Sequence, residues 1–561
     1  MKNKRALSWL IALGMTAMLM TFVLLGTEVR YSQNDDAGIL RAFLGQESGT
    51  PARFHIYIHG LFALPLAALS TAFPLMPWFT YLQLALLALA CMVISKSIMQ
   101  CFVKHDQSIW LGAAAAALFL LTLCLKHISR ITFTETAALL GAAAVLQMLS
   151  IDYERGGWRV ALGLTGAAAL VMFAYALRQV TALPVLAFCA LVFVFSLWHH
   201  RAAAKPMLAG LFITAFLMGG MAGFRAAETE SSGAQDYLAW QDANTQVIDF
   251  YGLDQLGEEE LALVGWDETT LRMAKSWCFL DSDLSTEAFL TLTDHLQKHD
   301  TRTFSDRASQ AWTAFAGMVK LYQLDMRCLC LALIAGVFAL ACACIRKDLR
   351  TVLLIACAVL GSVVMLAYLS WEGRLPIRAV MMVTMPLSAV LMAMLPSARK
   401  GVVIAGLCVM TALCAWCLTD ILPVILPNEE EELALGNAMG DLEEYAVDEP
   451  DSLFIYDSTL VGADLRAFPD YEYGMPTNLT FWGGWGLRSP ENCALFERWG
   501  IDLADFDPET FLRDDVFLAT GRIDPPPTML LKWLEAKTGK SIDWEIWSEY
   551  GSVYILHFYE N

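Results

Sequence analysis

Charged residues are scarce in this chain. Only 17% of its 561 residues are Asp, Glu, Lys or Arg, whereas 57% are hydrophobic and the mean hydropathy is +0.49. Soluble globular domains carry about 25% charged residues. The composition therefore excludes a soluble globular protein and indicates an integral membrane protein with many spans.

Positive charge is scarcer than negative charge, with 38 basic against 57 acidic residues and a net charge of −19. Two segments hold most of the excess: residues 225–320 contain 17 acidic and 7 basic residues, and residues 428–561 contain 28 and 8. The remaining, membrane-rich part is net basic. No basic surface for a phosphate backbone is expected, so nucleic acid is excluded as a partner.

Several motifs of known chemistry are also missing. The chain contains no Walker A loop, no Rossmann glycine fingerprint and no HExxH pattern, so ATP-driven transport by this chain alone is not indicated. Most of the 14 Cys lie in apolar runs as small hydrophobic residues, and they do not form the paired C-x-x-C groups of a zinc site. Cys278 and Cys493 lie in the two acidic segments, where a disulfide would require close Cβ atoms.

Eleven apolar runs are long enough to cross a bilayer, which takes about 20 helical residues. A twelfth run, 56–73, contains Gly60 and Pro65 and is interpreted as an interfacial or re-entrant helix. The eleven lie near residues 7–27, 77–95, 109–125, 133–150, 159–177, 181–198, 206–224, 327–345, 351–369, 377–395 and 401–421.

Basic clusters in the short loops predict the orientation. With eleven spans almost every Lys and Arg cluster falls on the side of the N-terminus, which is therefore cytoplasmic; a twelfth crossing at 56–73 would reverse the clusters from Lys96 onward. Both acidic segments are then extracytoplasmic in a multi-pass plasma-membrane protein. The predicted parts are a transmembrane module, 1–224, an outer helical insertion, 225–322, further transmembrane helices, 323–424, and a small outer α/β domain, 425–561, with strands at 452–456, 516–520 and 553–558.

The first outer loop, 28–55, contains two adjacent carboxylates, Asp35 and Asp36. Adjacent acids repel, so one should have a raised pKa unless a cation stabilises the pair. Such a pair suits a general base for an acceptor hydroxyl, or a site that holds a divalent metal against phosphate oxygens. The alternative is that both residues cap the helix 37–44.

Further charged residues are predicted near the outer membrane face. Arg374 and Arg378, at i and i+4, could clamp a phosphate, or could pair with Glu372 and lipid headgroups. Arg178 interrupts two apolar runs and is a candidate anion ligand. Arg130 and Glu135 follow the third span and either contribute to the site or serve as an interfacial cation and a helix cap.

Histidine and tryptophan residues supply weaker candidates. His55 and His59 are expected to share one helical face at i and i+4, either as substrate contacts and interface packing or, less in keeping with the absent HExxH glutamate, as metal ligands. Trp482 and Trp485 could stack on sugar rings of an acceptor, or pack in a core.

A first span followed at once by an outer Asp35-Asp36 loop, an interfacial helix and many further spans resembles the C-type membrane glycosyltransferases (GT-C). The resemblance implies a polyprenyl-phosphate-linked sugar as donor, Asp35 or Asp36 as base or metal ligand, and Glu135 as a further acid. Some members use a divalent metal, Mg²⁺ or Mn²⁺, and others use none. The stretch Trp482-Gly483-Gly484-Trp485 resembles uncharacterised multispan bacterial proteins.

The fold class expected is therefore an α-helical integral membrane protein of GT-C-like architecture. The function implied by the resemblance is hexosyl or pentosyl transfer from a polyprenyl-phosphate donor to a cell-surface glycan or polymer at the extracytoplasmic face. Two alternatives stay open: a non-catalytic transporter or flippase of lipid-linked glycans, and a scaffold in cell-envelope assembly. Spans nearly free of mid-membrane charge favour the enzyme over the transporter.

Overall fold

A computed structural model describes residues 2–46, 49–155, 157–300, 302–373, 375–427, 438–461, 465–469, 474–524 and 527–561. Within these residues, eleven helices are long and apolar enough to cross a membrane, at the positions that hydropathy predicts. They are α1 (Lys2–Gly26), α4 (Trp78–Lys104), the continuous run α5 (Ile109–Phe119), η1 (Leu120–Cys124) and α6 (Leu125–Ser129), then α7 (Phe133–Ser150), α8 (Trp158–Leu177), α9 (Ala182–His199), α10 (Ala204–Ser231), α16 (Gln323–Arg346), α17 (Leu349–Trp371), α18 (Ile377–Met394) and α19 (Lys400–Ile425). The prediction of a multispan helical protein is confirmed.

The twelfth apolar run forms a short helix, α3 (Gly60–Ala72), which begins directly after its N-cap, His59. Thirteen residues reach only about 20 Å in a helix, too little for a hydrocarbon core of about 30 Å. The prediction that this run adds no further span is confirmed.

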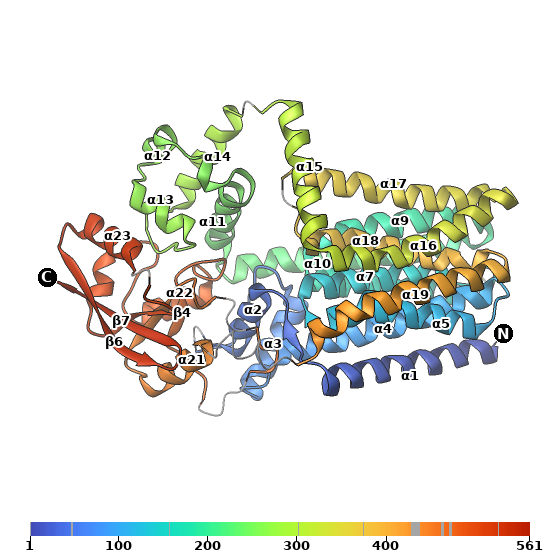
Figure 1. Ribbon diagram of the computed structural model, residues 1–561, viewed down its shortest axis with the longest axis horizontal. Coiled ribbons are helices and arrows are strands. Elements are labelled where there is room, and N and C mark those ends of the chain that lie inside the picture. Colours follow the sequence, from blue (N-terminus) through green and yellow to red (C-terminus); the bar gives the residue numbers. More distant parts are fainter. Residues whose placement is uncertain are drawn as a thin grey trace.

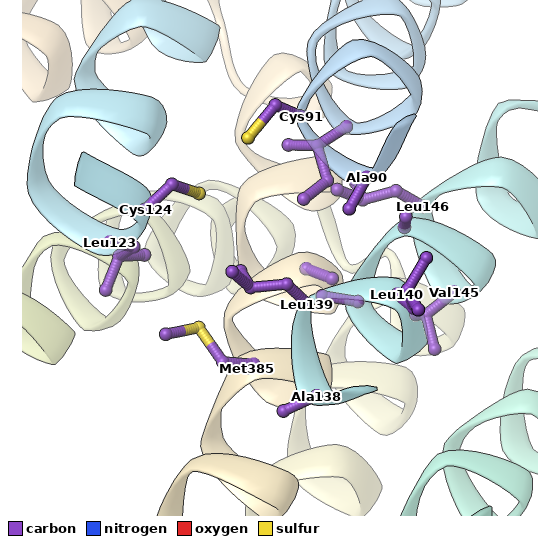
Figure 2. Packing of buried hydrophobic residues seen from close by; sticks show 14 of the residues in the cluster. Ala90, Cys91, Leu123, Cys124, Ala138, Leu139, Leu140, Val145, Leu146 and Met385 are labelled. Atoms are coloured by element: carbon purple, nitrogen blue, oxygen red, sulfur yellow. The ribbon is translucent and has the colours of Figure 1, made fainter. Parts of the chain in front are cut away.

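Helix α7 lies at the centre of the bundle and packs against α4, α8, α9 and α18. Its sequence is rich in Ala and includes Gly141, and these small residues let neighbouring helices approach closely. Leu139 of α7 lies among Cys91, Cys124 and Met385 from three other spans (Figure 2). This packed centre provides a rigid base for the polar residues at the ends of the helices.

The polar parts of the chain gather at one end of the bundle, and the N-terminus lies at the other (Figure 1). The insertion is helical, with α11 (Gln235–Thr245), the turns η5 (Gln246–Tyr251) and η6 (Leu253–Gln255), α12 (Glu258–Val264), α13 (Glu268–Lys275), α14 (Thr286–Lys298) and α15 (Phe304–Leu321). The first outer loop, the insertion and the C-terminal region therefore face the same side, as the span count requires.

The C-terminal region contains a five-stranded mixed sheet in the order β4-β3-β5-β7-β6. Strand β3 (Leu453–Tyr456) is parallel to β4 (Leu479–Phe481) and β5 (Val516–Thr520), and the antiparallel hairpin β6 (Ile542–Tyr550) and β7 (Val553–Glu560) extends the sheet. Helices α21 (Ala438–Asp448), α22 (Pro490–Arg498) and α23 (Thr528–Thr538) accompany it. The three predicted strands are present, whereas β4 and β6 were not predicted.

The insertion and the C-terminal region share one hydrophobic core, which includes Trp240, Phe279, Trp482 and Trp533. The Phe279 N–H donates to the Trp482 carbonyl oxygen at 3.0 Å, and the Trp533 indole N–H donates to an Asp281 carboxylate oxygen at 2.7 Å. These two acidic segments, separated by four spans, therefore fold as one outer unit.

Two very short parallel strands position the first outer loop. Strand β1 (Arg30–Tyr31) pairs with β2 (Arg130–Ile131), which precedes α7. The pairing continues as the Ser32 N–H donates to the Ile131 carbonyl oxygen at 2.9 Å. Helix α2 (Asn34–Leu44) starts immediately afterwards, so its first turn is held against the end of the central span.

Candidate functional site

A cavity of about 1540 Å³ lies where the first outer loop, the insertion, the C-terminal sheet and the outer ends of three spans meet. One wall is apolar and comes from α9, α17 and α18, with Leu183, Val364 and Met382 among its residues. The opposite wall comes from the insertion and the sheet and is rich in amide and hydroxyl side chains: Gln241, Asn244, Gln246, Gln297, Ser458 and Asn492.

Asp35 lines this cavity from the first turn of α2 and keeps 21% of its side chain exposed. Its Oδ2 accepts a hydrogen bond from Arg378 Nη1 at 2.8 Å, and its Oδ1 accepts one from Trp485 Nε1 at 3.3 Å. The position also suits a carboxylate because the N-terminal end of a helix carries a partial positive charge. The cap is Gln33, without a side-chain hydrogen bond, so Asp35 does not serve as the helix cap.

Two arginines surround the Asp35 carboxylate. Arg378 stands in the first turn of α18, and Arg178 stands between α8 and α9, with its guanidinium 4.4 Å from the centre of the Tyr57 ring. Arg178 Nε is buried and has no hydrogen-bond acceptor within the described residues. Two guanidinium groups face one carboxylate here, which leaves positive charge available to an anionic ligand.

Tyr57 links these groups and was not predicted from the sequence. Burial, with the Asp35 charge as a second cause, raises the pKa of the Tyr57 hydroxyl to about 12. The phenol is therefore neutral at physiological pH and can donate a hydrogen bond into the cavity. The aromatic residue had no distinguishing sequence signal beyond its place two residues after His55.

Asp36 has different surroundings from its neighbour and does not line the cavity. Its side chain is 0% exposed, and its Oδ1 accepts hydrogen bonds from the Phe133 N–H at 2.7 Å and from Gln83 Nε2 at 3.3 Å. Burial, with the charges of Asp35 and Glu135 adding to it, raises the pKa of this carboxyl well above its usual range. Asp36 therefore attaches the first outer loop to the start of α7.

A shared divalent metal does not fit these residues. Asp35 and Asp36 share no hydrogen-bond partner among the described residues, and Asp36 is enclosed by protein. Across the described part of the chain, no three His, Cys, Asp or Glu side chains are grouped so that they could hold a metal ion.

Glu135 and Arg130 lie outside the cavity lining. Glu135 is buried, and its Oε2 lies 2.7 Å from His127 Nδ1, while the neighbouring Lys126 ammonium donates to both oxygens of Asp325 at 2.7 Å. Arg130 donates to the carbonyl oxygens of two segments, those of Glu28 and Val424. These residues connect the outer ends of the spans. They were predicted to contribute to the site, but neither lines the cavity.

His55 and His59 do not share a helical face, and that prediction is wrong because α3 begins only after His59. His55 Nδ1 accepts from the Tyr57 N–H at 3.1 Å, and burial together with Arg225 and Arg178 lowers the pKa of His55 to about 3. His59 Nδ1 accepts from the Leu61 N–H at 3.0 Å. Both rings therefore stabilise the turn that leads into α3.

Of the two predicted tryptophans, only Trp485 lies at the cavity. Trp485 lines the cavity and packs edge-on against His55, with ring centres 4.7 Å apart, and against Tyr57. Trp482 is buried in the core shared with the insertion. Trp485 therefore connects the C-terminal sheet to Asp35, whereas Trp482 has a core position.

Polar atoms without partners mark residues that the sequence did not single out. Gln179 Nε2 and Gln241 Oε1 line the cavity and have no hydrogen-bond partner in the described part of the structure. Arg302 and Arg307 also reach the cavity but are both held by Asp300, each at 2.7 Å. Gln179 follows Arg178 directly in the sequence, and this pair of polar residues between two apolar runs was the signal that could have indicated Gln179. Arg374 lies outside the described residues.

Comparison with protein-family models and with curated proteins finds no match for this chain. The fold and the cavity therefore define its class on their own. It is a multi-pass helical membrane protein in which an outer unit covers a charged cavity at the ends of the spans.

Proposed function

We propose that this protein is a GT-C-type glycosyltransferase that moves a sugar from a polyprenyl-phosphate donor to a cell-surface glycan or polymer. The observation that carries the proposal is the position of the Asp35 carboxylate. It faces, together with Arg378 and Arg178, a cavity bounded by membrane helices on one side and polar domains on the other. A sugar carried on a polyprenyl phosphate has three parts that match this cavity: an apolar chain for the membrane helices, an anionic phosphate for the arginines and a polar sugar for the polar domains.

The apolar wall supports a lipid-borne donor. Leu183 of α9 and Val364 and Tyr368 of α17 line the cavity and are exposed, and both helices are apolar enough to cross a membrane. The inner ends of the same two helices are joined, because Arg350 Nη1 lies 2.8 Å from His199 Nδ1. A polyprenyl chain can therefore lie against α9 and α17 while its phosphate reaches the arginines.

The amide wall supports sugar binding. Neutral amide and hydroxyl side chains both donate to and accept from sugar hydroxyls without a desolvated charge. Gln241 Oε1 is an acceptor without a partner among the described residues, and Gln179 Nε2 is a donor without one. Both lie on the cavity surface, where an unpaired buried polar atom is costly until a ligand pairs with it.

The mechanism assigns the base to Asp35. The acceptor hydroxyl oxygen attacks the anomeric carbon from the face opposite the phosphate, and its proton passes to Asp35. The bond between the anomeric carbon and the phosphate oxygen breaks, the electron pair leaves with polyprenyl phosphate, and the configuration inverts. Arg378 and Arg178 stabilise the charge on the leaving phosphate, and as Arg378 turns to the phosphate it frees the carboxylate for the proton.

A proton-coupled transporter of lipid-linked glycans is the second candidate, and one observation favours it. Lys126, His127, Glu135 and Asp325 form a chain of ionisable groups, three of them buried, at the ends of the spans. A transporter must also open toward the opposite side, and the central helix α7 beneath the cavity has 89% of its span buried in protein. The packed centre favours the enzyme.

The first test is the sugar composition and linkage of cell-surface polymers in strains with native, deleted and Asp35→Asn protein at equal levels. We expect Asp35→Asn to lower transfer by roughly 10²- to 10⁴-fold, to remove the same sugar as the deletion and to accumulate the lipid-linked donor. Asp420→Asn is the matched control, because Asp420 also pairs with an arginine, Arg327 at 2.5 Å, but lies outside the cavity. If Asp35→Asn matches the native strain while deletion disturbs the envelope, the transferase proposal is wrong.

A further inference from the structure

We propose that α15 lies flat on the outer leaflet as an interfacial membrane helix, with the lipid bilayer as the partner of its exposed apolar face. This inference concerns a surface of the insertion outside the amide wall and does not depend on the reaction proposed above. Helix α15 connects the insertion to the span α16, and only Tyr322 separates them.

The apolar face of α15 is a stripe and not a scatter of hydrophobic residues. Phe304, Trp312 and Phe315 are spaced by eight and three residues, which places them along one side of a helix with 3.6 residues per turn. Phe304 is 78% exposed and Trp312 is 69% exposed. Large aromatic side chains lined up on an exposed helix face mark an interaction surface.

Other faces of the same helix behave differently. Met318, three residues after Phe315, is buried and packs against the bundle core, so one edge of the stripe contacts protein. Thr313, on the side away from the stripe, is an exposed polar residue. Asp306 at the start and Lys320 at the end add charges outside the stripe. The helix therefore has an apolar side, which contacts protein along one edge and exposes Phe304 and Trp312, and an opposite polar side, which is the pattern of an interfacial amphipathic helix.

Both ends of α15 are attached at the level where spans leave the membrane. The Phe304 ring packs on Trp371, the last residue of α17, with ring centres 5.1 Å apart, and the C-terminal end joins the first turn of α16. Figure 1 shows α15 lying across the ends of these spans, not along them. A helix held in this way lies parallel to the membrane surface.

The apolar stripe is continuous with lipid-facing protein surface, and this favours lipid over another protein as its partner. Tyr368, Leu360 and Val363 are exposed along α17, the span on which α15 packs. Tryptophan and tyrosine concentrate at membrane–water boundaries, because the ring is apolar and the polar atom reaches water. Trp312 and Tyr368 have that chemistry at this boundary.

The test is site-specific photo-crosslinking in the full-length protein. Benzoylphenylalanine replaces Trp312 or Phe315 in turn, the protein is reconstituted in nanodiscs of phosphatidylcholine and phosphatidylglycerol, and lipid adducts are measured by mass spectrometry after illumination. Thr313 carries the probe in the control, because it lies one residue after Trp312 on the polar side and is also exposed.

We expect lipid adducts at Trp312 and Phe315 at a yield roughly fivefold or more above that at Thr313. Equal yields at all three positions, or no adduct at any, would overturn the proposal, since the stripe would then face water. Adducts between two protein copies at Trp312 would also overturn it, because the partner would be a second copy of the chain.

Discussion

Asp35 and Asp36 are neighbours in the chain but have different chemical surroundings. Asp35 shares a cavity with two arginines, and its carboxylate accepts a hydrogen bond from Arg378 at 2.8 Å. Asp36 is enclosed, and a buried carboxyl favours its neutral form because charge is poorly solvated there. Asp35 can therefore accept a proton in a reaction, while Asp36 stabilises the loop that carries Asp35.

Replacement of Asp36 by Asn tests this division. The folded-state pKa of Asp36 is raised, so above an ordinary carboxyl pKa the folded protein keeps a proton that the unfolded chain has lost. The contribution of Asp36 to stability is therefore largest at low pH and declines as pH rises toward the raised pKa. Asn is neutral at every pH and can still accept from the Phe133 N–H.

We expect Asp36→Asn to be more stable than the native protein at pH 8, by on the order of 1 kcal/mol, with a smaller difference at pH 5. Thermal unfolding of both proteins in the same detergent at the two pH values measures it. Glycan transfer should stay within about tenfold of native, whereas a general base would lose far more. A loss as large as that of Asp35→Asn would return the base to Asp36.

At the scale of elements, close approach of helices depends on small residues. A Cβ atom added at Gly141 in α7 would lie 2.2 Å from Val185 Cγ2 in α9, so the two helices could not keep their present separation. Gly361 in α17 has no neighbouring atom within 4 Å of the corresponding position. The two glycines are both in apolar spans and differ only in what surrounds them.

Gly141→Ala should therefore destabilise the protein by about 1–3 kcal/mol, because overpacking forces α9 outward. Gly361→Ala should be neutral or stabilising by up to about 1 kcal/mol, because alanine favours a helix. Differential unfolding of full-length protein in detergent compares them, and equal shifts for both variants would contradict the packing of α7 on α9.

At the scale of the whole molecule, the distribution of charge follows the architecture. The two acidic segments fold together at one end of the bundle, and the basic loops lie at the end that holds the N-terminus. Basic short loops remain cytoplasmic in membrane proteins. The arrangement therefore predicts that the outer unit and the cavity face away from the cytoplasm.

Cysteine labelling of intact cells tests this orientation. Lys532→Cys, exposed on α23, should react with a membrane-impermeant maleimide, whereas Lys104→Cys and Lys347→Cys should react only after permeabilisation. Ala203, in the loop before α10, is only 1% exposed and is not a suitable reporter. The native cysteines that are exposed must first be replaced, namely Cys330, Cys344, Cys357 and Cys408. Labelling of Lys104→Cys in intact cells would reverse the predicted orientation.

The spans were predictable because a helix in lipid must satisfy its own backbone hydrogen bonds and present about 20 apolar residues, both of which are local properties. The charges of the short loops predicted that the run 56–73 does not cross the membrane. The helix that forms there, Gly60–Ala72, is too short to cross, which agrees with this prediction. Strands β4 and β6 were missed because one is only three residues long and the other, IDWEIWSEY, is mostly exposed and lacks a buried apolar pattern.

The candidate site was only partly predictable. Asp35, Arg178, Arg378 and Trp485 were named from the sequence and line one cavity, although 450 residues separate Asp35 from Trp485. Asp36, Glu135, Arg130, His55, His59 and Trp482 were named by the same reasoning and have other partners. Both groups consist of charged and aromatic residues predicted near the same membrane face. Residue type and predicted position therefore could not distinguish the cavity residues from the others.

The sequence by itself determined the membrane class, the eleven candidate spans and the division into apolar spans and polar segments, because hydropathy and charge are properties of short stretches of chain. Only the tertiary structure decided which polar residues meet. Asp35 faces Arg378 and Trp485 because α2, α18 and the loop after β4 converge there, and Asp36 faces inward because consecutive helical residues point in different directions. Long-range packing sets such contacts, and no local pattern encodes them.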